Sequence, residues 1–121
     1  NALGQALRAA RAGNRLNAIG LAVERTAARC GFEVIRSLPG HGIGQTLHEQ
    51  PSVLNFYHPR AKQVLVEGMV FTVEPFLSLS ARDVEKGADG WALLTADGSL
   101  AAQYEHTIVV TRGEPVILTA L

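Results

Sequence analysis

The hydrophobic pattern changes its period once along the chain, close to Gly31, and this change most constrains the fold. Before it, apolar residues recur at helical spacing, first in a short segment that closes at Gly13 and then in a second one that runs to Gly31. From Phe32 onward, glycine, proline and aspartate separate short β-branched runs, which is typical of strands and turns. The pattern predicts an α+β fold, with two helices followed by a mostly antiparallel sheet.

The expected elements can be placed more closely along the chain. Asn14 or Asn17 is in position to cap the second helix. The polar stretch 80–90 is expected to form a loop or a strand connection. Extended segments are expected at 32–37, 69–79, 91–95, 103–111 and 115–119.

The size and charge of the chain limit the classes of protein to consider. With 121 residues and 47% hydrophobic content, it is long enough for one compact domain or part of one. Eleven basic residues balance eleven acidic ones, so no overall charge indicates a nucleic-acid or membrane partner. The opening at Asn1, which leads at once into a helical pattern, predicts that the segment begins inside a longer protein.

The single cysteine, Cys30, lies in the apolar helical pattern and has no partner for an internal disulfide. We expect a buried, unreactive thiol rather than a catalytic one. A reducing, cytoplasmic location fits this cysteine usage.

Strand alternation gives two glutamates a defined direction. Phe71 and Val73 share one face of their strand, so Thr72 and Glu74 point to the other. Pro75 keeps the residue before it extended, which makes the direction of Glu74 better defined than that of a loop glutamate.

The second glutamate lies in a similar apolar strand. Gln103, Glu105 and Thr107 share one face, and Tyr104 and His106 share the other. Glu105 and His106 are therefore not expected to bind the same metal ion.

Two histidines lie near a glycine-rich turn. His41 has Gly40 and Gly42 as neighbours, which lets a ligand or metal approach closely, and His48 enters the same region seven residues later. A single such histidine is more often structural than a ligand, and a single strand glutamate is more often solvated or salt-bridged. Together, one imidazole and two carboxylates in apolar runs predict a metal site, because buried charge is costly unless it is paired.

This donor set suits Mn, Fe, Co or Zn, and in particular a pair of bridged ions that polarises a carbonyl and activates water. Hydrolysis is the chemistry that such a site favours.

Five segments follow one another along the chain: Gly40-His41-Gly42-Ile43-Gly44, His48-Glu49-Gln50-Pro51, Gly68-Met69-Val70-Phe71-Thr72-Val73-Glu74-Pro75, Asp89-Gly90-Trp91 and Ala101-Ala102-Gln103-Tyr104-Glu105-His106-Thr107. In this order and approximate spacing, these segments resemble the type I methionine aminopeptidases.

The resemblance extends over essentially the whole chain and implies the pita-bread fold, in which two pseudo-symmetric halves surround a central metal site. Residues 1–121 resemble the C-terminal half of the catalytic domain. The implied activity is removal of the N-terminal methionine from nascent proteins when the next residue is small. It implies two divalent metal ions, peptide or nascent-protein N-termini as substrates, proximity to the ribosome, and a monomeric, cytoplasmic full-length protein.

The resemblance also assigns roles to individual side chains. His41, Glu74 and Glu105 match metal ligands, with Glu105 bridging the two ions, and Glu74 also matches the general base. His48 matches a histidine that binds the substrate near the scissile peptide and stabilises the developing tetrahedral intermediate. Trp91 matches an aromatic position near the methionine pocket, although a core or loop-anchoring tryptophan explains it equally well.

Two departures from the family pattern matter. Leu47 stands where a bulky aromatic often lines the methionine pocket, which puts the shape of that pocket in doubt. The family also takes two aspartate ligands from the first half of the domain. Asp83, Asp89 and Asp97 do not match them and are expected in turns or on the surface.

Residues 1–121 alone are therefore not expected to assemble a normal two-metal site. Three alternatives stay open: an inactive fragment, a non-catalytic pita-bread binding module, and a proline-specific aminopeptidase of the same fold.

Overall fold

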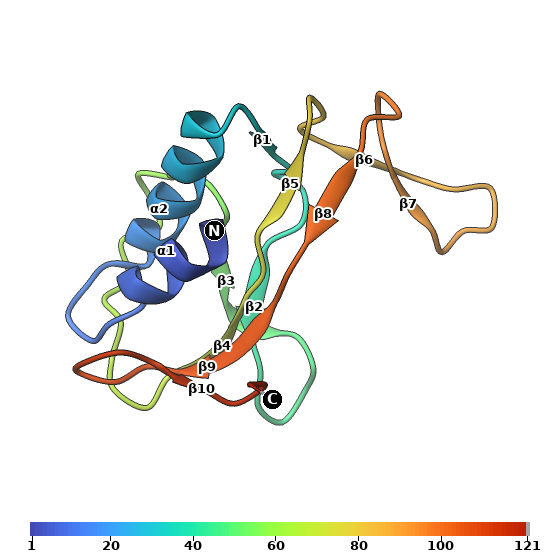
Figure 1. The fold of residues 1–121 in the computed structure, drawn as a ribbon. Helices are drawn as coiled ribbons and strands as arrows, with labels where there is room; N and C mark the ends of the chain where they lie inside the picture. Colours follow the sequence, from blue (N-terminus) through green and yellow to red (C-terminus); the bar gives the residue numbers. More distant parts are fainter. Residues whose placement is uncertain (121) are drawn as a thin grey trace.

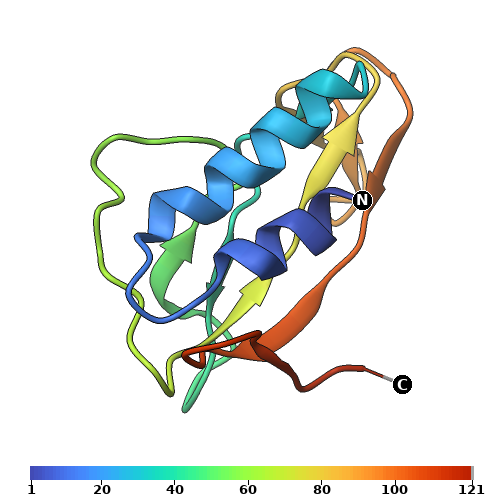
Figure 2. The ribbon, with the colours of Figure 1, turned by 60° about the vertical axis from the view of Figure 1, so that its left-hand side comes forward.

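The computed structural model describes residues 1–120 and begins with the two expected helices, α1 (Ala2–Ala9) and α2 (Leu16–Arg29). They pack against each other on one side of the strands (Figures 1 and 2). Each buries an apolar stripe at helical spacing, because residues three or four apart share a helix face. In α1 the stripe is Ala2 and Ala6, and in α2 it includes Leu16, Ile19, Val23 and Ala27.

The expected cap of α2 by Asn14 or Asn17 is wrong. The cap position is Arg15, which makes no side-chain cap hydrogen bond, and the Asn14 amide donates to the carbonyl of Ala9 instead (2.9 Å). The first amides of α2 need no side-chain cap, because the backbone N–H groups of Leu16 and Asn17 donate to carbonyls of the segment 61–63.

All the strands pair antiparallel, in three sheets (Figure 1). The largest has the order β10 (Val116–Ile117), β9 (His106–Val109), β4 (Val70–Val73), β2 (Gly40–Gly42), β3 (Glu49–Val53). The second is β1 (Glu33–Val34), β5 (Phe76–Ser78), β8 (Ala101–Gln103). The third is the hairpin β6 (Val84–Lys86), β7 (Leu93–Thr95).

The two long strands expected at 69–79 and 103–111 are each interrupted, and the interruptions face each other. Val73 pairs with His106 before the gap, and Phe76 pairs with Gln103 beyond it. The same register runs across both pairs, so Glu74 lies opposite Glu105 where the strands separate.

Other segments differ from expectation. Strands β2 and β3 occupy a region expected to be a glycine-rich loop, and β6 lies inside the polar stretch 80–90. These strands form by pairing with other segments of the chain, and local composition does not indicate such pairing. Cys30 is exposed rather than buried, because α2 ends at Arg29 and Cys30 lies beyond the stripe that packs on the core.

The core lies between the helices and the five-stranded sheet. The helical stripe packs against strand residues that are almost fully buried, among them Val53, Phe71, Val73 and Ile108. Within the described residues 1–120, no helix is long and apolar enough to cross a membrane. Since the helices occupy one face, polar side chains can gather on the other.

Candidate metal site

Three side chains, one within a strand and two at the ends of strands, converge on the face away from the helices. His41 lies in the middle of β2, Glu74 directly follows β4, and Glu105 directly precedes β9. One potential ligand atom from each lies within 4.8 Å of the others, and no other such group of histidine, cysteine or acidic side chains occurs within residues 1–120. Strand alternation around the two glutamates and the glycines around His41 therefore indicated three side chains that the fold brings together.

The strand pairing explains this convergence. Strands β2 and β4 are neighbours, which places the Nε2 atom of His41 3.5 Å from Oε1 of Glu74. The register of β4 against β9, and of β5 against β8, places Glu105 opposite Glu74. Strand β2 and the adjoining ends of β4 and β9 thus each place one donor at a single point.

The two glycines beside His41 let β2 lie very close to its neighbours. A Cβ atom on Gly42 would collide with the carbonyl of Gln50 in β3, and one on Gly40 would collide with the carbonyl of Thr72 in β4. Both glycines are buried. Their role is close backbone approach, which holds the His41 backbone between two strands.

The ring of His41 has a defined orientation. Its Nδ1 atom lies 2.9 Å from the carbonyl oxygen of Gly42, and because a carbonyl only accepts, Nδ1–H must donate. In the neutral ring this assigns the lone pair to Nε2, the atom that faces Glu74. A backbone hydrogen bond of this kind is the usual way in which a ligating imidazole is oriented.

Glu74 is buried, with 9% of its surface exposed. Burial raises its pKa above the usual range, a hydrogen bond from Thr72 acts in the opposite direction, and the nearby charge of Glu105 raises the pKa further. Two facing carboxylates beside one imidazole nitrogen are donors suited to a divalent cation, and a bound cation would offset the repulsion between the two carboxylates. The residues present therefore fit a metal ion.

His48 lies beside this group. Its ring centroid is 4.2 Å from that of His41, and both rings line a cavity of about 310 Å³ that also reaches Glu74. The loop between β2 and β3 is held by Glu49, whose carboxylate accepts hydrogen bonds from the backbone amide and the hydroxyl of Thr46. Leu47 is exposed in the same loop.

Trp91 lies apart from these side chains. It is 89% exposed in the turn between β6 and β7 and is absent from the lining of the His41 cavity. Its backbone amide donates to Asp89 (2.9 Å), which places Asp89 in a turn as expected. A core tryptophan is excluded by the exposure, and proximity to a methionine pocket stays a prediction.

Asp97 also occupies a turn. The hydroxyl of Ser80 and the Ser99 residue donate hydrogen bonds to its carboxylate, and they lower the pKa of Asp97 to about 2. Asp83 is exposed. The expectation that these aspartates serve turns or the surface is confirmed.

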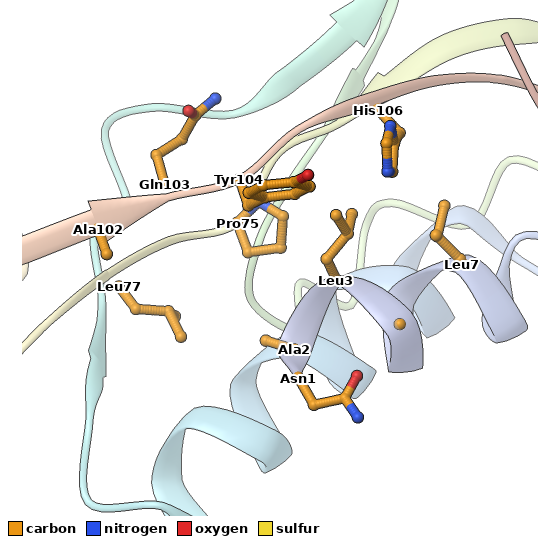
Figure 3. Close-up of a pocket in the computed structure, with 11 residues that line it drawn as sticks. Asn1, Ala2, Leu3, Leu7, Pro75, Leu77, Ala102, Gln103, Tyr104 and His106 are labelled. Atoms are coloured by element: carbon orange, nitrogen blue, oxygen red, sulfur yellow. The ribbon is translucent and has the colours of Figure 1, made fainter. Parts of the chain in front are cut away.

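A larger cavity, of about 530 Å³, lies on the helix side of the strands (Figure 3). Its lining is mostly apolar, with Leu3 of α1 facing Tyr104, and it contains no acidic side chain. Figure 3 shows Tyr104 and His106 on the α1 side and Gln103 on the opposite side, where Gln103 donates to Glu105 (3.0 Å). The expected separation of Glu105 from His106 is confirmed.

Sequence reasoning missed the role of one buried amide. Asn55 is 2% exposed, and its Nδ2 atom donates to the carbonyls of Leu38 and Glu74, both at 3.0 Å. It ties the segment that leads to His41 to the backbone of Glu74. No local signal distinguishes Asn55 from an ordinary loop asparagine, because both acceptors are distant in sequence.

Comparison with known proteins decides the family. The model of metallopeptidase family M24 matches residues 1–112. The chain belongs to this family. Methionine aminopeptidase 2 of Bacillus subtilis is 47% identical over 122 residues, which cover 100% of this chain and 49% of the relative. The M24 chain thus spans about half the length of that curated relative.

Solved structures agree with the fold. The crystal structure of methionine aminopeptidase from Thermotoga maritima superposes with a TM-score of 0.93 at 38% identity, covering 99% of this M24 chain and 48% of the other. The X-Pro aminopeptidase of the same organism gives 0.64 at 25% identity, covering 99% and 28%. The predicted pita-bread type of α+β fold, and the resemblance to methionine aminopeptidases, are confirmed.

The close approach at β2 generates a first prediction. Gly42→Ala should lower the free energy of unfolding by about 1–3 kcal/mol, because the added methyl group meets the Gln50 carbonyl. Gly113→Ala is the matched control, since the nearest atom to its Cβ is 4.0 Å away. Denaturant unfolding of the full-length protein measures both, and equal stability of the two variants would contradict the packing described for β2.

Proposed function

We propose that the whole protein removes the N-terminal methionine from new polypeptides when the next residue is small, by metal-dependent hydrolysis. The observation that carries this proposal is the convergence of His41, Glu74 and Glu105 beside His48. The similarity to methionine aminopeptidases supports the reaction and the substrate class.

We propose that His41, Glu74 and Glu105 hold divalent metal of the Co, Mn, Fe or Zn type. Membership of a metallopeptidase family supports metal binding. Two ions, with Glu105 bridging them, are the number that the family resemblance implies. Bound there, the metal would polarise the scissile carbonyl and lower the pKa of water.

The chain's own side chains would carry the remaining steps. Glu74 is the general base, and it takes a proton from the attacking water. His48 donates a hydrogen bond to the oxygen on which negative charge develops, a role that suits an imidazole at the edge of the same cavity. Leu47 and Trp91 are proposed to lie near the methionine side chain, where Leu47 would leave more room than an aromatic residue.

The alternatives are less well supported. A proline-specific aminopeptidase is disfavoured because the X-Pro enzyme superposes less well than the methionine enzyme does. A non-catalytic binding module does not require the side chains that are retained here. An inactive fragment stays an expectation for residues 1–121 taken alone and concerns this segment rather than the whole protein; it is supported by the metal-binding group, which no aspartate within residues 1–120 joins.

The physiological setting stays a prediction. A cytoplasmic location, a monomeric full-length protein and proximity to the ribosome follow from the family resemblance. Peptide N-termini are the substrates that the names of the relatives support.

The metal site generates a second prediction. The full-length protein should release methionine from a Met-Ala-Ser peptide only with added divalent metal, and Glu105→Ala should abolish release because one carboxylate donor is lost. Glu114→Ala, which removes an exposed acid outside the group, is the control and should leave release unchanged. Liquid chromatography of the products measures this, and metal-independent release would contradict the proposal.

His48 generates a third prediction. His48→Ala should lower kcat by roughly 10²–10³-fold, the cost of losing one donor aimed at developing charge, with metal affinity preserved. His58→Ala removes a histidine outside the His41 cavity and serves as the control. Steady-state kinetics and metal titration measure the two effects, and an unchanged kcat would exclude the proposed role.

A further inference from the structure

The Thr72 hydroxyl lies between two of the proposed metal ligands. Thr72 belongs to β4 and is 2% exposed. The backbone N–H of His41 donates to its Oγ1 atom at 2.9 Å, and the same Oγ1 lies 2.7 Å from Oε1 of Glu74. One buried hydroxyl therefore contacts the backbone of one ligand and the carboxylate of another.

The direction of these hydrogen bonds follows from the groups involved. A backbone N–H only donates, so the hydroxyl accepts from His41, and its single proton remains available. An ionised carboxylate only accepts, so that proton goes to Glu74. The other nearby acceptor, the His41 carbonyl, is less favourable at 3.4 Å.

We propose that Thr72 is a positioning residue, which fixes the Glu74 carboxylate relative to His41 so that both present their donors to the same metal ion. The short bond to Thr72 holds Oε1 of Glu74 at 3.5 Å from Nε2 of His41. This inference rests on the proposed metal site. Hydrogen bonds to ligating carboxylates orient them, and their loss weakens metal binding.

A purely structural role for Thr72 is the competing explanation. Any buried threonine that loses its hydroxyl leaves partners unsatisfied and destabilises the protein. Thr26 offers the comparison within this chain, because it is 6% exposed and its hydroxyl donates to the Ala22 carbonyl inside α2 (2.8 Å). Thr26 lies outside the metal-binding group.

The test compares three variants in the full-length protein. Thr72→Val keeps the shape of the side chain but removes the hydroxyl, and Thr72→Ser keeps the hydroxyl. Thr26→Val removes another hydroxyl of a buried threonine, on the helix side. Calorimetric titration with Co²⁺ alone gives the metal affinity, the visible absorption of bound Co²⁺ reports the ligand geometry, and thermal unfolding of metal-free protein reports stability.

We expect Thr72→Val to bind Co²⁺ roughly 10- to 100-fold more weakly, with a changed absorption spectrum. Thr72→Ser should recover most of the affinity, and Thr26→Val should lower only the unfolding temperature. Wild-type affinity and spectrum in Thr72→Val would overturn the inference. So would an equal loss of affinity in Thr26→Val, or a failure of Thr72→Ser to recover binding.

These measurements distinguish a wrong proposed function from a wrong positioning role for Thr72. A wild-type protein that binds Co²⁺ but releases no methionine overturns the proposed activity, and the Thr72 variants still decide the positioning role. A wild-type protein that binds no Co²⁺ overturns both.

Discussion

The antiparallel register between two pairs of strands is the constraint on which the candidate site depends. Strand β4 pairs with β9, β5 pairs with β8, and the register is the same on both sides of the interruption. It therefore sets Glu74 opposite Glu105, although 30 residues lie between them in the sequence. A shift of one residue would turn one carboxylate to the helix side and separate the two donors.

Placing the exposed carboxylate of Glu105 opposite the buried carboxylate of Glu74 has a cost. The raised pKa of Glu74 reflects that cost, because burial and the charge of Glu105 both disfavour the ionised form. The apolar core on the other face, with Phe71 and Val73 fully buried, stabilises the strand that carries this side chain. The hydroxyl of Thr72 and the amide of Asn55 then hold the carboxylate and its backbone in place.

Much of this arrangement could be predicted from the sequence, and the remainder could not, for physical reasons. The helical stripe and the alternation around Glu74 are local patterns, so both helices and the face of the glutamate were predictable. Strands β2 and β3 were not, because the two glycines of β2 carry no side chain that could show a strand pattern, and β3 depends on its pairing with β2. The contacts of Asn55, and the contact of Thr72 with the His41 backbone, could not be predicted because the partners are distant in sequence.

Anomalous diffraction from crystals of the full-length protein grown with Co²⁺ tests the central claim most directly. The account predicts an anomalous peak at about 2.0–2.2 Å from Nε2 of His41 and from carboxylate oxygens of Glu74 and Glu105. A peak bound elsewhere, or no peak beside these three side chains in metal-saturated protein, would contradict it.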